Sequence, residues 1–254
     1  MEARVANEEL EEWHSSITNV ERNKLSTYGF PQESIIREFS YEEMVFLLLK
    51  GCRPSTIERT LLRSVIVSHV SHGITGQSTL AVRMAADTRA SFLHALIAGF
   101  STGAGAYHQG GLEATMRELI ELHGVPEGSL EATILDRLSR GHHFMGFGHR
   151  FHKEHDPRAD TLIEIADEIG HTGSYFTLVK KVAAIIRREK SVPMNIEAAG
   201  GALLLDIGIE PEIAHIIIII GRAPMFAAAY AERLRENKAP FQRIKVFDNV
   251  GPQE

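Results

Sequence analysis

Histidines lie within two residues of a glycine in three separate segments of the chain, a setting in which an imidazole can take part in catalysis. The segments are Ser71-His72-Gly73, residues 107–111 and residues 146–150. A histidine titrates near neutral pH, so it can donate a hydrogen bond to a carbonyl oxygen or transfer a proton. Neighbouring glycines let the backbone turn sharply and approach a ligand closely. Three such histidines favour a site for acid–base or carbonyl chemistry.

The third segment continues into a longer motif. A glycine–aromatic–glycine–histidine turn ends at His149, and an Asp-Pro-Arg tripeptide follows, ending at Arg158. This segment resembles the signature of the citrate synthase family, with both residues at the family's spacing. Other matching features follow in the family's order. His72 lies in a His-Gly turn before the helix carrying Arg83, and His108 comes before a glycine pair. Residues 193–197 stand in place of a Pro-Asn-Val-Asp block, and residues 221–224 resemble a late arginine turn.

The resemblance extends from about residue 13 to residue 252. The short chain and residues 13–30 are most similar to the small citryl-CoA lyase branch of the family. The resemblance implies an all-α, compact multi-helix fold that forms a homodimer. It also implies one domain over residues 1–254, with a small lid-like helical subdomain at about residues 140–225.

The resemblance implies a role for each matching residue. His149 would hydrogen-bond the carbonyl of a 2-oxoacid, or the corresponding hydroxyl in cleavage. His108 would stabilise the enol of the acyl-CoA, and Glu197 stands where the family has the aspartate that removes the α-proton. Substrate carboxylates would be held by His72, Arg158, Arg222 and Arg243, the last being the nearest candidate for an arginine shared across a dimer. The nucleotide end of coenzyme A would meet Met145, Gly146, Phe147, Gly148 and Lys153.

This set of residue types suits chemistry beside a thioester. The α-proton of a thioester is weakly acidic, so a carboxylate base alone removes it slowly. A hydrogen-bond donor on the thioester oxygen stabilises charge that develops only in the transition state, an effect of about 2.7–4 kcal/mol. Arginines bind carboxylates through two parallel hydrogen bonds, which lysines do not reproduce. Cleavage of a citryl thioester would run the same arrangement backwards.

Three positions depart from the family pattern. Ser71 precedes His72 where most relatives have an acid, Gln109 follows His108 where glycine is usual, and Glu197 is one methylene longer than aspartate. A displacement of about 1 Å can lower a rate by ~10²-fold. The leading hypothesis, which follows from the resemblance, is cleavage of citryl-CoA to acetyl-CoA and oxaloacetate, or the reverse condensation, with a coenzyme A thioester as substrate and no permanently bound cofactor. A divergent enzyme that joins another acyl-CoA to another 2-oxoacid, and a non-catalytic scaffold that binds coenzyme A, remain open.

Structural roles are the alternative for each of these residues. His72 and His108 could be hydrogen-bonded structural histidines, Arg222 a helix cap or ion pair, and Glu197 a favourable charge at a helix start. The spacing of three between His149 and the next two histidines could suit a metal on one face of a helix. A glycine before and a proline after them argue against a continuous helix, so no metal site is predicted.

Helical signals dominate the chain. Residues 55–58 have the form of a capping box and precede apolar residues at helical spacing. Further helices are expected over residues 113–123, 160–169, 175–188 and 196–207. Pro211 is placed to open a helix that includes residues 213–220, and Pro224 to open the next one, which reaches about residue 235. Strand signals are scarce, with a weak candidate at residues 244–247. These patterns predict an all-α fold.

Composition sets the remaining expectations. The 254 residues are 44% hydrophobic with a net charge of −6, which suits a globular core and argues against a general nucleic-acid binder. The longest apolar run, residues 216–220, is far shorter than the ~20 residues of a membrane span, so we expect a helix buried on all sides. The acidic N-terminus shows no signal peptide, and the single Cys52 is expected to be a buried or half-buried thiol. These features predict a cytoplasmic protein with no membrane partner.

Overall fold

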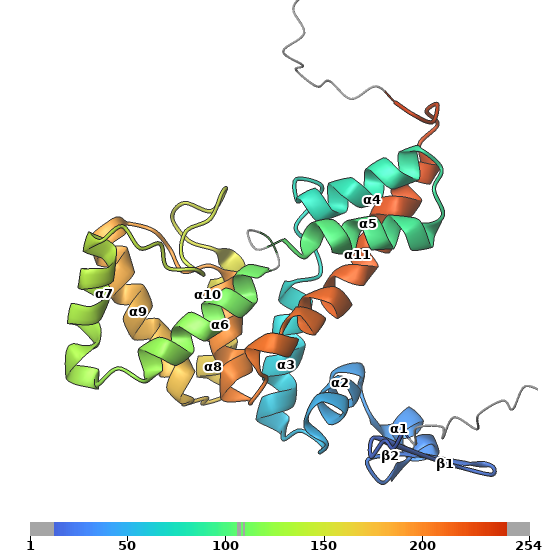
Figure 1. Cartoon of the computed structure of the whole chain (residues 1–254), viewed down its shortest axis with the longest axis horizontal. Helices are drawn as coiled ribbons and strands as arrows, with labels where there is room; N and C mark the ends of the chain where they lie inside the picture. Colours follow the sequence, from blue (N-terminus) through green and yellow to red (C-terminus); the bar gives the residue numbers. More distant parts are fainter. Residues whose placement is uncertain (1–12, 106–107, 109, 243–254) are drawn as a thin grey trace, which may run out of the picture. The chain divides into compact units, whose positions relative to one another are not determined.

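The computed structural model describes residues 13–105, 108 and 110–242. Eleven α-helices and three short strands lie within these residues (Figure 1), which confirms the predicted all-α class. Contacts divide the chain into two compact units, residues 1–59 and 60–254. Arg243 and the weak strand candidate at 244–247 lie outside the described residues. A lid-like subdomain at about residues 140–225 stays a prediction.

The first unit contains a small antiparallel sheet that the sequence did not predict. Its strands β1 (Thr18–Glu21), β2 (Lys24–Thr27) and β3 (Phe30–Pro31) pair in the order β1-β2-β3. A two-residue turn joins β1 to β2, with Asn23 at a φ of 61°, a conformation that asparagine tolerates better than most residues. All of β1 is exposed. Alternating hydrophobicity is therefore absent, and the pattern could not reveal the strands.

Two short helices complete this unit. They are α1 (Gln32–Glu38) and α2 (Tyr41–Lys50). A capping box starts α2, since the N–H of Ser40 donates to the carboxylate of Glu43 at 2.8 Å. Cys52 follows α2 and is exposed, so the expectation of a buried or half-buried thiol was wrong.

Helix α3 (Thr56–Ser68) begins with the predicted capping box. The N–H of Ser55 donates to Glu58 Oε2 at 2.8 Å, and the N–H of Glu58 donates back to Ser55 Oγ at 3.2 Å. Leu61, Leu62 and Val65 on one face of the helix are fully buried. The helix ends at the segment that carries His72, so its packing fixes one end of that segment.

Helices α4 (Gln77–Asp87), α5 (Phe92–Gly103) and α11 (His215–Arg235) pack against one another (Figure 1). Val82, Ala95 and Phe226 form the centre of their contact. Pro224 lies inside α11, so the prediction that it opens a new helix was wrong. A proline within a helix removes one backbone hydrogen bond, and the packing of Phe226 on α4 and α5 holds the helix on the far side of the proline.

The apolar start of α11 is less enclosed than expected. Ile217 and Ile218 are buried, but the isoleucines at 216, 219 and 220 are only half-buried, so the expectation of burial on all sides was wrong. Residues 211–235, which include the 3₁₀ turn Pro211–Ile213, are long and apolar enough to cross a bilayer by length and composition alone. Core helices of soluble proteins pass the same test, so the feature is weak evidence for a membrane span.

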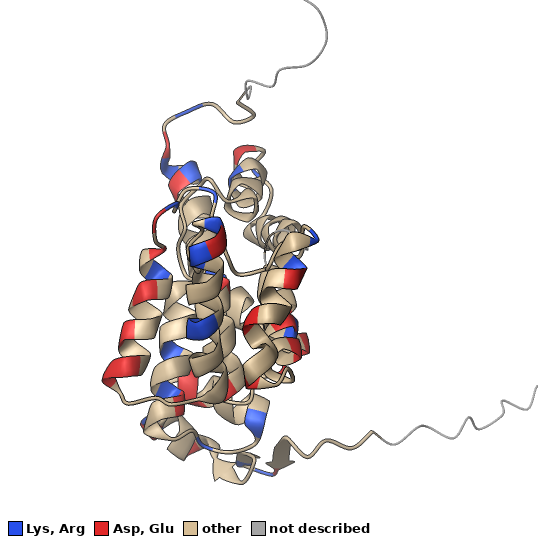
Figure 2. Ribbon diagram, turned by 90° about the vertical axis from the view of Figure 1, so that its left-hand side faces the viewer, with Lys and Arg blue, Asp and Glu red and all other residues tan. Residues whose placement is uncertain are grey.

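Helix α10 (Ile196–Asp206) is the centre of a second packed group. It contacts α6 (Gly110–His123), α8 (Pro157–Glu168) and α9 (Ser174–Lys190), while α7 (Leu130–Ser139) covers α9 and follows the 3₁₀ turn Glu127–Ser129. Eight of the eleven α10 residues are buried, most of them alanine, glycine or leucine. Charged residues of both signs are interspersed along the helices (Figure 2). Because α10 is held on several sides, its first turn is a rigid place for a functional side chain.

Candidate active site

A cavity of about 590 Å³ lies within the second unit and gathers most of the predicted site. Its wall includes the end of α3, the segment before α4, the loop before α8, and residues of α10 and α11. Seven predicted residues line it, namely His72, His108, Gly148, His149, Arg158, Glu197 and Arg222. Side chains more than 100 residues apart in the sequence therefore share one pocket.

The turn before His149 depends on two glycines. Gly146 and Gly148 both have a φ of +81°, a region that other residues rarely adopt. Beyond the turn, His149 Nδ1 accepts hydrogen bonds from the N–H groups of Phe151 at 3.1 Å and His152 at 3.0 Å. Two donors on Nδ1 place the proton of the neutral ring on Nε2, which lies 3.4 Å from Arg158 Nη2. Burial, with the nearby His152 and Arg158, lowers the pKa of His149, so this ring is a neutral donor near pH 7.

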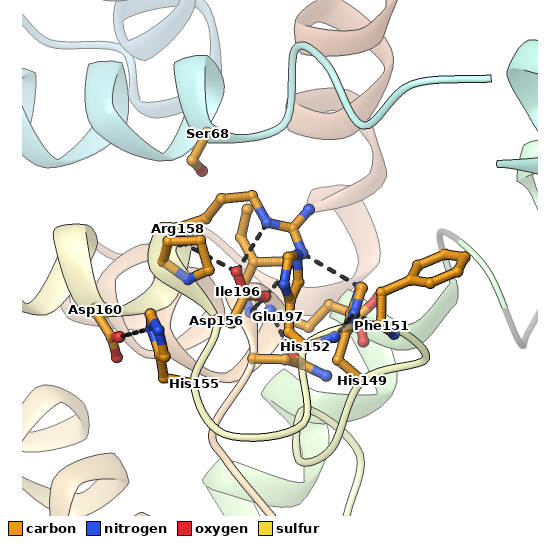
Figure 3. Close-up of polar contacts among 12 residues, drawn as sticks. Ser68, His149, Phe151, His152, His155, Asp156, Arg158, Asp160, Ile196 and Glu197 are labelled. Carbon is orange, nitrogen blue, oxygen red and sulfur yellow. Dashed lines mark hydrogen bonds and ion pairs between the residues drawn. The ribbon is translucent and has the colours of Figure 1, made fainter. Parts of the chain in front are cut away.

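Arg158 is held in place by a buried carboxylate (Figure 3). Asp156 is fully buried, and its carboxylate accepts from Arg158 Nη2 at 2.7 Å and from Nε at 2.9 Å. The same carboxylate caps α8 and accepts from the N–H of Ile196 at 3.3 Å. Burial acts to raise the pKa of Asp156, but the hydrogen bonds from Arg158 bring it below its ordinary value. Asp156 is therefore an ionised anchor that orients Arg158, a role the sequence did not assign.

Asn195 joins the His149 loop to the start of α10. Its side chain caps α10 by accepting from the N–H of Glu197 at 2.9 Å, and its Nδ2 donates to Gly148 O at 2.9 Å. Its own N–H donates to Gly146 O at 2.9 Å. Asn195 thus fixes Glu197 relative to His149. The sequence signal for this residue was an asparagine directly before a helix, a common N-cap.

Glu197 enters the cavity from the first turn of α10. Burial raises the pKa of its carboxyl to about 7, with a further contribution from Asp156, while Arg158 acts in the opposite direction. A carboxyl with a pKa near the working pH can both accept and release a proton, as a general base or acid requires. Its carboxylate lies beside Gly111 in the first turn of α6.

His72 and His108 form another part of the cavity wall. Their rings stack with centroids 5.8 Å apart, and Ser78 Oγ lies 2.8 Å from His108 Nε2. Burial, followed by the charge of Arg222, lowers the pKa of His72 to about 4 and lowers that of His108. Both rings are therefore neutral near pH 7 and suited to hydrogen bonding. A side chain at Gly76 would collide with the His72 ring, so that glycine makes room for it.

Arg222 is a buried cation with unused donors. It is only 4% exposed, and neither Nε nor Nη1 has a hydrogen-bond partner among the described residues. Burial and the charge of Arg158 lower the pKa of Arg222 to about 10, so it stays charged near pH 7. Two guanidinium groups on one cavity, one of them with two nitrogens that no described residue accepts from, suit a ligand that carries carboxylates.

His69 also lines the cavity, although the sequence analysis did not select it. Its Nδ1 lies 2.8 Å from Val65 O and so carries the proton, which leaves a lone pair on the buried Nε2. Nε2 has no partner within the part of the chain that the structure describes. In the sequence, His69 comes at the end of an amphipathic helix, where a residue that only packs in the core would also be expected. No sequence signal therefore marked it as a functional residue.

Of the residues predicted to bind coenzyme A, only Gly148 lines the cavity. The N–H of Met145 donates to Glu118 Oε2 at 3.1 Å, Gly146 lies against α10, and Phe147 packs on the apolar cluster around α9 and α10. Lys153 is exposed. The first three support the His149 turn, and Arg243 lies outside the described residues.

The three histidines considered for a metal do not converge. The rings of His149 and His152 stack at 4.4 Å, whereas His155 Nδ1 pairs with Asp160 Oδ2 at 2.9 Å (Figure 3). Across residues 13–105, 108 and 110–242, no group of three or more His, Cys, Asp or Glu side chains has the arrangement of a metal site.

Comparison with known sequences identifies the family. Residues 52–244 match the family described as "Citrate synthase, C-terminal domain". The chain belongs to the citrate synthase family. Citrate synthase 2 of Bacillus subtilis is 26% identical over 220 residues, which are 85% of this chain and 58% of that protein. A citrate synthase of Deinococcus radiodurans is 25% identical over 75% of this chain and 52% of that protein. This family member therefore spans little more than half the length of these relatives.

Solved structures similar to this chain include some of matching length. Citryl-CoA lyase from Hydrogenobacter thermophilus superposes with a TM-score of 0.85 at 27% identity, covering 96% of this chain and 97% of that one. Citrate synthase from Thermoplasma acidophilum, in a ternary complex with carboxymethyl coenzyme A and oxaloacetate, gives a TM-score of 0.71 at 22% identity and covers 85% of this chain and 58% of that one. The second likeness shows the fold alone.

Proposed function

We propose that this protein cleaves citryl-CoA to acetyl-CoA and oxaloacetate, or catalyses the reverse condensation. The observation that carries the proposal is the shared cavity of Glu197, whose pKa is about 7, with neutral imidazoles and two guanidinium groups. The likeness to a citryl-CoA lyase over nearly the full length of both chains supports cleavage as the direction.

The oxoacid end of the substrate would bind first to the cationic part of the cavity. Arg158 and Arg222 would each take a carboxylate, with His72 as a neutral donor beside them. The Nε2–H of His149 would then donate to the oxoacid carbonyl, making its carbon more electrophilic. The ring already has its proton on the nitrogen that this role requires.

In condensation, Glu197 would remove the α-proton of acetyl-CoA while His108 donates a hydrogen bond to the thioester oxygen. The enolate carbon would attack the oxaloacetate carbonyl carbon, and the new alkoxide, stabilised by the Nε2–H of His149, would take a proton from solvent. In cleavage, the hydroxyl would lose its proton to solvent beside the same donor, the carbon–carbon bond would break, and Glu197 in its carboxylic acid form would protonate the α-carbon of the acetyl-CoA enolate. A pKa near 7 provides both forms of Glu197.

Coenzyme A would enter as part of the substrate, with its nucleotide near the 145–148 turn and Lys153. We propose a cytoplasmic homodimer in which Arg243 of the second subunit reaches a substrate carboxylate. Dimer formation would then be needed for substrate affinity as well as for stability.

A second candidate is the condensation of another acyl-CoA with another 2-oxoacid. It is favoured by Glu197 itself, which moves the base one methylene further than the family's aspartate would. A cavity with two arginines would still select an oxoacid with more than one carboxylate, so the difference would lie in the acyl group.

Mass spectrometry of products tests these candidates. Wild type and Glu197→Gln are incubated with citryl-CoA, and separately with acetyl-CoA or propionyl-CoA and a panel of 2-oxoacids. We expect acetyl-CoA and oxaloacetate from citryl-CoA, with the rate at least ~10²-fold lower in Glu197→Gln. A clear preference for propionyl-CoA or another oxoacid would establish the second candidate. Tight coenzyme A binding without turnover of any substrate would contradict both and leave a binding scaffold.

A further inference from the structure

The carboxylate of Glu197 occupies space that a side chain at residue 111 would need. A Cβ built on Gly111 would lie 2.5 Å from Glu197 Oε2, 2.7 Å from Oε1 and 2.8 Å from Cδ. These distances are all below the closest approach of ordinary Cβ contacts. All three nearest atoms belong to Glu197. The absence of a side chain at Gly111 therefore leaves room for the Glu197 carboxylate.

Gly111 is also tied to the second catalytic group. It is buried in the first turn of α6, and its N–H lies 3.4 Å from His108 O. Glu197 comes from the first turn of α10, which packs against α6. The close approach of the two helix starts therefore sets the position of the carboxylate relative to His108.

We propose that Gly111 is the positioning residue that lets this chain use a glutamate as its base. The glycine provides the space for the extra methylene of Glu197, so that its carboxylate reaches the α-carbon of the acyl-CoA from the correct side of His108. The inference rests on the proposed function and adds that residues 111 and 197 form a matched pair. With alanine at 111, the matching base is aspartate.

The overlap between a Cβ at residue 111 and the Glu197 carboxylate sets the loss of rate expected from Gly111→Ala. With Gly111→Ala, Oε2 must move by about 0.9 Å, from 2.5 Å to an ordinary contact of at least 3.4 Å. The colliding atoms are the far end of a flexible side chain, so the carboxylate yields and the fold is retained. A displacement near 1 Å costs ~10²-fold in rate. The loss falls on kcat, because the arginines that bind the oxoacid are untouched.

The test is a double-mutant cycle of Gly111→Ala and Glu197→Asp in the full-length protein, measured as turnover in the direction in which wild type is active. We expect Gly111→Ala to lower kcat by ~10²-fold in the glutamate background with little change in KM. In the Glu197→Asp background the same substitution should cost less than about threefold, because the shorter side chain leaves room for the methyl group. A crystal structure of Gly111→Ala should show the Glu197 carboxylate displaced by about 0.9 Å. The distance from Oε2 to the new Cβ would then be 3.4 Å instead of the 2.5 Å of the undisplaced position.

The control is Gly124→Ala at the other end of α6, where the nearest atom to a new Cβ is Glu121 O at 3.4 Å. It should leave kcat and the thermal midpoint unchanged. Equal losses from Gly111→Ala in both backgrounds, or an undisplaced carboxylate, would overturn the pairing. Loss of the proposed function would be recognised separately, by absence of turnover in wild type or full activity of Glu197→Gln.

Discussion

The two sides of the cavity differ in how their polar groups are satisfied. On the loop side, residues 148–158, His149 accepts two backbone N–H groups and Arg158 is paired with Asp156. On the helix side, His69 and His72 lie in the segment that follows α3, and Arg222 lies within α11. Each has at least one buried nitrogen without a partner among the residues described.

This difference means that the protein itself orients the polar groups of the loop side, whereas a bound ligand would satisfy those of the helix side. The loop side is oriented by the chain's own groups, so its donors are aimed before any ligand arrives. On the helix side, burial of a cation without an acceptor costs free energy that folding does not recover. A ligand with carboxylates would supply the acceptors. Stability should therefore respond in opposite ways to mutations on the two sides.

The largest expected effect is on the loop side. Arg158→Leu leaves the Asp156 carboxylate buried without its cation, which should lower the free energy of unfolding by about 3–5 kcal/mol. Chemical denaturation at pH 7 measures this loss. Replacing Asp156 by asparagine as well, in Arg158→Leu with Asp156→Asn, removes the buried charge while keeping a side-chain oxygen to cap α8, and should restore part of the stability. A single variant as stable as wild type would show that the pair does not anchor the loop.

On the helix side, Arg222→Leu should have the opposite signature. The free energy of unfolding should stay equal to that of wild type or rise, because no described protein acceptor loses its partner. Oxaloacetate affinity should fall by ~10²-fold, equivalent to about 3 kcal/mol for charge-assisted hydrogen bonds. Calorimetric titration and denaturation of the same sample measure both. A loss of stability like that of Arg158→Leu would instead identify Arg222 as a structural ion-pair or capping residue.

Glu197, between the two sides, should make stability depend on pH. Its pKa rises from 4.5 when unfolded to about 7 when folded, so the folded state holds the proton more tightly. Stability from this group is complete below pH 4.5 and is lost as the pH rises through 7. Glu197→Gln should therefore be more stable than wild type by roughly 2–3 kcal/mol at pH 8, with no difference near pH 4.5. A constant difference across this range would contradict the raised pKa.

A smaller effect is expected at Ser78, which orients His108. Ser78→Ala removes the 2.8 Å contact between Ser78 Oγ and His108 Nε2. One neutral hydrogen bond contributes about 1 kcal/mol, so kcat/KM should fall about fivefold. Thr79→Ala is the matched control, since the neighbouring Thr79 is equally buried and its hydroxyl has no partner within the described ranges. Equal effects of the two substitutions would point to packing of α4 rather than to His108.

The residues that line the cavity also differ in how far the sequence alone could predict their roles. His149, Arg158 and Glu197 were found because motifs in separate segments resembled one family, and the helices that carry Arg158 and Glu197 begin with recognisable caps. Asp156, Asn195 and His69 were missed because their roles depend on contacts across the fold. Asp156 had the appearance of a helix cap, and His69 that of a core residue. The exposed strand β1 lacked alternation, and Pro224 had the local features of a helix start although packing continues α11 through it.

Hydrogen exchange at the acetyl group tests the central claim most directly. Acetyl-CoA is incubated in deuterated water with oxaloacetate and either wild-type protein or Glu197→Gln, and the methyl group is followed by mass spectrometry. We expect deuterium uptake with wild type, at a rate at least ~10²-fold higher than with Glu197→Gln. No uptake by wild type with any acyl-CoA, or equal uptake with both proteins, would contradict a thioester enolised by Glu197 in this cavity.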